Sequence, residues 1–114
     1  AAAYGVLQAA HAAALRQARP GVTAESVDRA AREVIAEAGY GEYFIHRTGH
    51  GIGLSTHEEP YIMAGNDLVL EPGMCFSIEP GIYLPGQWGM RLEDIVVVSA
   101  DGVESLSHQQ RELR

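Results

Sequence analysis

The stretch TAESVDRAAREVIAEAG, which runs from Thr23 to Gly39, decides how this 114-residue chain begins to fold. Its apolar residues follow the helical spacing i, i+3, i+4, i+7, i+8, i+11, and they are Val27, Ala30, Ala31, Val34, Ile35 and Ala38. Thr23 is a residue type that caps the first turn of a helix, and Gly39 stands where a helix readily ends. We therefore predict an amphipathic helix between these two residues.

An alanine-rich segment, residues 1–19, precedes this helix and has a helical apolar stripe of its own. The stripe consists of Tyr4, Leu7, Ala14, Leu15 and Ala18. Pro20-Gly21 separates the two segments, so the pair is predicted to form a helical hairpin. His11 lies on the stripe, and we expect it to pack half-buried in the hairpin rather than to bind a metal.

Short β-prone runs alternate with glycine and proline from Tyr43 onward. The expected strands are Tyr43–His46, Met74–Glu79, Arg91–Val98 and Val103–Leu106. A helical hairpin followed by a run of short strands is typical of an α+β protein. The predicted fold is therefore a helical hairpin packed on a mostly antiparallel sheet, in one domain.

The composition excludes several classes of protein. Hydrophobic residues make up 46% of the chain, which is typical of a folded globular domain. A net charge of −7 with no basic stripe argues against a nucleic acid partner, and no apolar run is long enough to span a membrane. Cys75 is the only cysteine, so no internal disulfide can form and a reducing cytoplasm is the expected location.

Three potential metal ligands each lie in a distinct short motif. His50 lies in TGHGIG (48–53), Glu79 lies near the end of LEPGMCFSIEPG (70–81), and Glu93 lies in MRLED (90–94). A charged side chain in such apolar or glycine-rich stretches is costly without a partner. One imidazole and two carboxylates form a ligand set for divalent Mn, Co, Fe or Zn.

The residues around these ligands leave alternatives open. His57, in the stretch STHEEP (55–60), is either a surface histidine or a hydrogen-bond donor to substrate. Glu79, at the end of an apolar run, is either solvated or a ligand that also accepts a proton from water. Glu93 and Asp94 should point to opposite faces of a strand, and Arg91 should share the face of Glu93. There Arg91 either orients a carboxylate or forms a plain surface ion pair.

The order of these motifs resembles the catalytic half of the pita-bread metallopeptidases of family M24. The motifs are GHGIG (49–53), a histidine seven residues after His50, LEPGM (70–74) with EPG (79–81), and RLED (91–94). The resemblance covers nearly the whole chain and implies about half of a pita-bread (creatinase/aminopeptidase) fold. The glutamate within RLED and the histidine motif HRTGH (46–50) resemble the Xaa-Pro dipeptidase and aminopeptidase P branch more than the methionine aminopeptidases.

The resemblance implies hydrolysis of the peptide bond between an N-terminal residue and a following proline. It also implies two bound divalent ions, with Mn or Co first and Zn or Fe as alternatives. By this resemblance His50, Glu79 and Glu93 are metal ligands, with Glu93 shared by both ions and Glu79 also acting as general base. In the same way His57 stabilises the tetrahedral intermediate, and Arg91 steadies the site.

The chain departs from the family pattern upstream of the helical hairpin. Family members use two further aspartate ligands there, and none of the four aspartates of this chain precedes the first predicted helix. We therefore expect residues 1–114 to be the C-terminal part of the catalytic domain, without the two upstream aspartates and the N-terminal domain. We expect this part to be inactive alone, and to be homodimeric or associated with the missing N-terminal part.

Three other functions stay open from the sequence. A methionine aminopeptidase-like peptidase would use the same metal ligands. A non-catalytic binding module of the same fold, binding protein or nucleic acid, would be expected to have lost its ligands. A metal-free enzyme of the same fold, resembling creatinase, is the third, and the presence of Glu79 and Glu93 argues against it.

Overall fold

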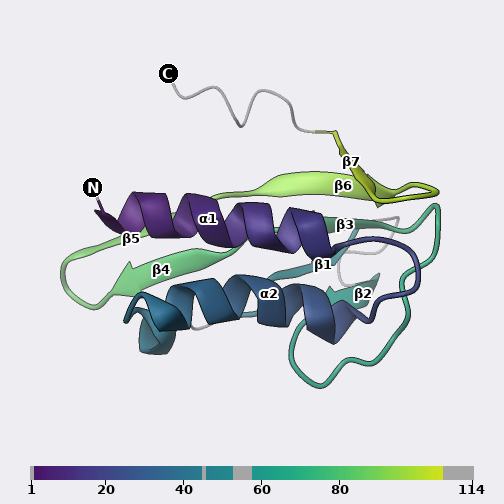
Figure 1. The fold of residues 1–114 in the computed structure, drawn as a ribbon. Coiled ribbons are helices and arrows are strands. Elements are labelled where there is room, and N and C mark those ends of the chain that lie inside the picture. The colour runs from purple at the N-terminus through teal and green to yellow at the C-terminus, as the bar shows by residue number, and fades with distance from the viewer. Residues whose placement is uncertain (1, 45, 53–57, 107–114) are drawn as a thin grey trace.

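The computed structural model describes residues 2–44, 46–52 and 58–106. Helix α1 (Ala2–Gln17) and helix α2 (Ala24–Glu37) pack side by side on one side of the strands (Figure 1). The predicted helical hairpin is therefore confirmed. Within the described ranges, no helix combines enough length and apolar character to cross a membrane.

Both ends of α2 form as its capping residues predict. At the N-terminus, the Thr23 side chain accepts a hydrogen bond from the Ser26 backbone N–H at 3.2 Å. At the C-terminus, Gly39 adopts a φ of 92°, and the Tyr40 N–H donates back to the Ile35 carbonyl at 3.0 Å. This backward bond satisfies one of the carbonyls that the last turn of the helix leaves open.

Replacing Thr23 by Ala is expected to lower the free energy of unfolding by about 1 kcal/mol, because the Ser26 N–H loses its side-chain acceptor and keeps only the Thr23 carbonyl. Urea unfolding of the complete gene product that contains this sequence measures the change. Thr23→Ser is the matched control, since it keeps the hydroxyl and should unfold near the wild-type midpoint. Equal losses in the two variants would contradict the capping role.

A five-stranded sheet and a two-stranded hairpin follow the helices. The sheet has the strand order β2-β1-β3-β6-β7, and the hairpin pairs β4 with β5. The strands are β1 (Gly49–Gly51), β2 (Glu58–Ile62), β3 (Cys75–Ile78), β4 (Gly81–Leu84), β5 (Trp88–Arg91), β6 (Asp94–Val98) and β7 (Val103–Ser105). Each of these pairings is antiparallel, so the predicted α+β class is confirmed.

The predicted strand Tyr43–His46 is wrong. Its start belongs to a short 3₁₀ helix, η1 (Gly41–Tyr43), that follows α2. Arg32 of α2 donates to the carbonyls of Phe44 and His46 at 3.0 Å each. These carbonyls therefore find their hydrogen-bond partner on a helix rather than in a sheet.

The predicted strand Arg91–Val98 forms as two pieces. They are the end of β5 and the whole of β6, with a break at residues 92–93 where the chain leaves the hairpin and enters the sheet. Across this break the Leu92 N–H donates to the Pro80 carbonyl at 3.2 Å. The chain therefore continues antiparallel to the segment that follows β3.

The hydrophobic core lies between the helical hairpin and the sheet. It includes Leu7, Ala10 and Ala14 of α1, Val27, Ala31 and Ile35 of α2, and Phe76, Ile78, Val96 and Val98 of the sheet. Side chains alternate between the two faces of a strand. Since Phe76 and Ile78 face the core, the alternate residues Ser77 and Glu79 point to the opposite face, and the candidate site is built there.

Candidate metal centre

His50 and Ser77 lie directly opposite each other on neighbouring strands. Gly51 pairs with Phe76 in the antiparallel β1–β3 ladder, so the residues one step away, His50 and Ser77, also face each other. His50 is partly exposed between two buried glycines, and its N–H donates to the Ser77 hydroxyl at 3.1 Å. The imidazole therefore lies on the face of the sheet that is turned away from the helical core.

Gly49 allows β1 to approach β3 this closely. A Cβ atom at this position would lie 1.7 Å from the Ser77 carbonyl oxygen, far inside the contact distance of any side chain. The glycine before the histidine is therefore a requirement of strand packing. It brings the histidine backbone within hydrogen-bonding distance of the neighbouring strand.

The carboxylate of Glu79 is the centre of the polar contacts on this face. Its Oε2 lies 3.3 Å from His50 Nε2 and accepts a hydrogen bond from the Ser77 hydroxyl at 2.7 Å. Its Oε1 lies 3.5 Å from Arg91 Nη1. The side chain of Glu79 is only 13% exposed, so the Ser77 hydroxyl and the Arg91 guanidinium compensate a charge that water reaches poorly.

The orientation of the His50 ring suits metal binding. Its Nδ1 lies 3.0 Å from the Gly51 carbonyl, which can only accept, so Nδ1 carries a proton and the lone pair available to a metal is on Nε2. That lone pair faces Glu79 Oε2 at 3.3 Å. Two such electron pairs favour a cation or a proton between them, and imidazole with carboxylate is a donor set for divalent metals. The residues present therefore fit a divalent ion.

A pocket of about 210 Å³ opens beside these residues. It is lined by His46, Arg47, Gly49, His50, Glu79 and Arg91. The sequence predicts neither His46 nor Arg47 as a site residue, although both belong to the motif HRTGH. The His46 ring packs edge-on against Tyr83 of β4, with ring centroids 5.4 Å apart, so the hairpin contributes to the same wall.

Glu93 lies across from Glu79 along the backbone. The β3–β6 ladder ends with Ile78 paired to Asp94. Glu79 and Glu93 come next in this antiparallel register, which the hydrogen bond from the N–H of residue 92 to the carbonyl of residue 80 continues. The Glu93 side chain is exposed. Among the residues that the structure describes, no three His, Cys, Asp or Glu side chains gather closely enough to hold a metal. The structure thus brings two of the three candidate ligands into contact and places the third on the neighbouring segment.

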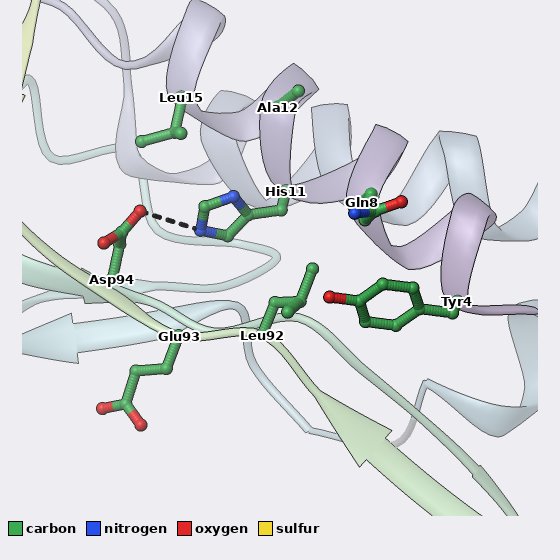
Figure 2. A pocket seen from close by; sticks show the side chains of 8 residues that line it. All are labelled: Tyr4, Gln8, His11, Ala12, Leu15, Leu92, Glu93 and Asp94. Atoms are coloured by element: carbon green, nitrogen blue, oxygen red, sulfur yellow. Dashed lines mark ion pairs between the residues drawn. The ribbon is translucent and has the colours of Figure 1, made fainter. Parts of the chain in front are cut away.

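Asp94 points in the opposite direction from Glu93, as predicted for neighbours in an extended chain. It is fully buried, with Oδ2 3.3 Å from His11 Nε2, and its Oδ1 accepts from the Ser105 hydroxyl at 2.8 Å. Figure 2 shows this pair facing a pocket under α1, with the Glu93 side chain pointing away from it. The half-buried position predicted for His11 is confirmed, and its contact with Asp94 is an addition that the sequence does not reveal.

Two further residues complete the comparison with the predicted site. His57, the predicted hydrogen-bond donor to substrate, lies outside the described residues. Ser77 is a site residue that the sequence prediction misses, since it is fully buried and links the His50 backbone to the Glu79 carboxylate. The available signal is a lone hydroxyl within the apolar run MCFSI (74–78), which needs a hydrogen-bond partner when buried.

The sequence of this chain matches a known family of proteins. Residues 1–100 match the model of metallopeptidase family M24. The chain therefore belongs to this family, and the resemblance drawn from its motifs is confirmed.

Relatives with this fold include named dipeptidases. The chain is 67% identical to the probable dipeptidase PepE of Mycobacterium tuberculosis over 110 residues, which are 96% of this chain and 29% of the relative. It is 58% identical to the Xaa-Pro dipeptidase of Lactobacillus helveticus over 111 residues, which are 97% of this chain and 30% of the relative.

A solved structure of a relative has the same fold as this chain. The crystal structure of dipeptidase PepE from Mycobacterium ulcerans matches with a TM-score of 0.90 at 65% identity, covering 92% of this chain and 28% of that one. The predicted pita-bread fold class is therefore confirmed. The chain spans about 30% of the length of the curated relatives it matches.

Proposed function

We propose that the protein containing this chain is a metal-dependent peptidase that hydrolyses the bond between an N-terminal residue and a following proline. The observation that carries this proposal is the contact of His50 Nε2 with Glu79 Oε2 at 3.3 Å, with Arg91 near the other carboxylate oxygen. The arrangement offers one imidazole nitrogen and one carboxylate oxygen to a shared cation. The similarity to the Xaa-Pro dipeptidase of Lactobacillus helveticus supports the choice of substrate.

The described residues have distinct roles in this reaction. Bound divalent ions supply Lewis acidity, which lowers the pKa of water and polarises the substrate carbonyl. His50 presents Nε2 as a ligand, because its Nδ1–H is held by the Gly51 carbonyl. Glu79 is a ligand and also accepts the proton that the attacking water gives up. Ser77 and Arg91 hold the two oxygens of that carboxylate in place.

Glu93, His57 and two aspartates complete the proposed site. The backbone register sets Glu93 across from Glu79, and Glu93 would help to hold a second ion. His57 donates a hydrogen bond to the oxyanion of the tetrahedral intermediate. Two aspartates on strands upstream of α1 supply the remaining ligands. Residues 1–114 are then the C-terminal part of the catalytic domain.

The metal, the assembly and the location are further parts of the proposal. We assign Mn or Co, with Zn or Fe as alternatives, because histidine with carboxylates suits each of these ions and availability decides among them. The single cysteine, Cys75, favours a reducing cytoplasm. The chain is proposed to act as a homodimer or in association with the upstream part of the same polypeptide.

The complete gene product that contains this sequence is expected to hydrolyse Ala-Pro in preference to Met-Ala when Mn²⁺ is present. A site that accepts proline after the cleaved bond should favour Ala-Pro by at least about tenfold in kcat/KM. The rate of each reaction is measured by chromatography of the free amino acids that are released. The 114-residue chain alone is expected to release little or nothing, since it carries three of the five family ligands.

Removal of the metal with EDTA, followed by readdition of Mn²⁺, is the control for this comparison. Activity should disappear and then return. Preferential cleavage of Met-Ala would overturn the proline branch in favour of a methionine aminopeptidase. Hydrolysis of neither peptide by the metal-loaded protein would favour a binding module. Robust Mn²⁺-dependent turnover by the 114-residue chain would contradict the need for the upstream aspartates.

A further inference from the structure

Asp28 is a buried carboxylate on the apolar face of α2. It is 1% exposed and lies on the same helix face as Val27 and Ala31, which are fully buried. A carboxylate is unfavourable in a helix interior, and it is costly in an apolar core unless its charge is compensated. Its hydrogen-bond partners therefore indicate its role.

Arg32 compensates this charge from the next turn of the same helix. Its Nε and Nη2 lie 3.1 Å from Oδ2 and Oδ1 of Asp28, which is a bidentate pair. The guanidinium also donates to the carbonyls of Phe44 and His46 at 3.0 Å each. The pair on α2 thus holds the segment that leads into the histidine motif.

Thr48 connects this pair to the candidate metal centre. Its hydroxyl donates to Asp28 Oδ1 at 2.7 Å, and its N–H is shared between Asp28 Oδ1 at 3.1 Å and the Ile62 carbonyl of β2 at 2.8 Å. Its carbonyl accepts from the Glu79 N–H at 2.6 Å. Thr48 is fully buried, and it stands just before the three-residue strand that carries His50. One residue is therefore fixed to a helix on one side and to the backbone of a candidate ligand on the other.

We propose that Asp28 is a positioning residue that sets the location of His50 relative to Glu79, an inference that rests on the proposed function. Ligands of a metal must lie within about 0.2 Å of their ideal distances. Strand β1 has only three residues, two of them glycines, so it contributes little rigidity of its own. The bonds between Thr48 and Asp28 add to the constraint that β2 and β3 provide, because they fix the entry of β1 against a packed helix.

Replacing Asp28 by Asn tests this role. The amide keeps the shape of the carboxylate and removes its charge. It has only one acceptor oxygen, so it cannot replace both carboxylate oxygens that accept hydrogen bonds from Thr48 and Arg32. In the complete gene product, this variant is expected to bind Co²⁺ about ten- to a hundredfold more weakly than the wild type. Titration of the visible absorption of bound Co²⁺ measures the affinity, and the shape of the absorption band reports ligand geometry. At saturating Co²⁺, kcat for Ala-Pro is expected to fall while KM stays within about twofold.

Two substitutions at Thr48 separate positioning from folding. Thr48→Val removes the hydroxyl and leaves the pair of Asp28 with Arg32 intact, so it should weaken Co²⁺ binding in the same direction and by a smaller factor. Thr48→Ser keeps the hydroxyl and should bind Co²⁺ like the wild type. Glu33→Gln removes an exposed carboxylate from the same helix and should leave the affinity unchanged. If Asp28→Asn does not fold, the two Thr48 variants decide the question.

The outcomes distinguish the inference from the function on which it rests. Wild-type Co²⁺ affinity and spectrum in folded Asp28→Asn or Thr48→Val protein would overturn the positioning role. A loss of thermal stability in Asp28→Asn without any change in Co²⁺ binding would overturn it too, since the residue would then be structural only. A wild-type protein that neither binds Co²⁺ nor hydrolyses Ala-Pro would overturn the proposed function, and the inference with it.

Discussion

Replacing Glu79 by Gln is expected to lower kcat for Ala-Pro by about a hundredfold to ten-thousandfold in the complete gene product. Glutamine keeps the size of the side chain, but it has no charge for a metal ion and cannot take up the proton of the attacking water. Its carbonyl can still accept from the Ser77 hydroxyl, which lies 2.7 Å from the native carboxylate. The variant should therefore fold normally and have a much lower catalytic rate.

Glu71→Gln is the matched control for this substitution. Glu71 lies in the same motif as Glu79 and its side chain is exposed, so its loss should leave kcat and the unfolding midpoint near the wild-type values. Hydrolysis rates at several Ala-Pro concentrations give kcat, and urea unfolding confirms that both variants are folded. A folded Glu79→Gln protein with the kcat of the control would contradict the role of Glu79 as ligand and general base.

Replacing Gly49 by Ala is expected to destabilise the protein by more than about 3 kcal/mol, at or beyond the upper end of overpacking substitutions. The added Cβ would lie 1.7 Å from the Ser77 carbonyl oxygen, which belongs to the backbone of β3 and cannot rotate away. Relief of the clash requires β1 and β3 to separate. That separation also breaks the hydrogen bond from His50 N–H to the Ser77 hydroxyl.

Gly102→Ala is the matched control for the glycine substitution. A Cβ at Gly102 meets no atom within 4 Å, and its φ lies outside the left-handed range that disfavours other residues. Soluble expression and urea unfolding of both variants measure the difference. An unfolding midpoint of Gly49→Ala equal to that of Gly102→Ala would contradict the close approach of the two strands.

These two substitutions separate the chemistry of the centre from its construction. Glu79→Gln should lower kcat by about a hundredfold to ten-thousandfold in a protein of nearly native stability. Gly49→Ala should reduce stability and hydrolysis together, because the strand that carries His50 loses its place. A pattern in which both variants lose only activity would mean that the β1–β3 contact contributes little to folding.

The helical hairpin could be predicted from the sequence because its signals are local. The apolar period of α2, the capping residue Thr23 and the terminal Gly39 all lie within one stretch of 17 residues, and the structure forms each of them. Amphipathic spacing over several turns is a strong signal, since only a helix presents such residues on one face. Nothing distant in the chain is needed to identify this element.

The strands beside the candidate site are less predictable, because their pairing is long-range. Strand β1 is three residues long, GHG, and has neither β-branched residues nor an alternating pattern. It forms because β2 and β3 pair with it on either side. The error at Tyr43–His46 has a similar origin, since Arg32 reaches the carbonyls of this segment from a helix.

The ligands of the candidate site could be predicted from the sequence, but the residues that hold those ligands in place could not. The motifs identify His50 and Glu79, and the structure places them in contact. Ser77, which binds the His50 backbone, lies 27 residues from it in the sequence. Asp28, which binds Thr48, lies 20 residues from it. No pattern within a short window can reveal such contacts.

An anomalous-difference map from crystals of the complete gene product soaked in Mn²⁺ tests the metal centre most directly. We predict a peak about 2 Å from both His50 Nε2 and a carboxylate oxygen of Glu79, with Glu93 turned toward the same peak or an adjacent one. Protein from the same preparation should hydrolyse Ala-Pro. A map without a peak at these atoms, from protein that hydrolyses Ala-Pro in the same Mn²⁺ concentration, would contradict the proposed centre.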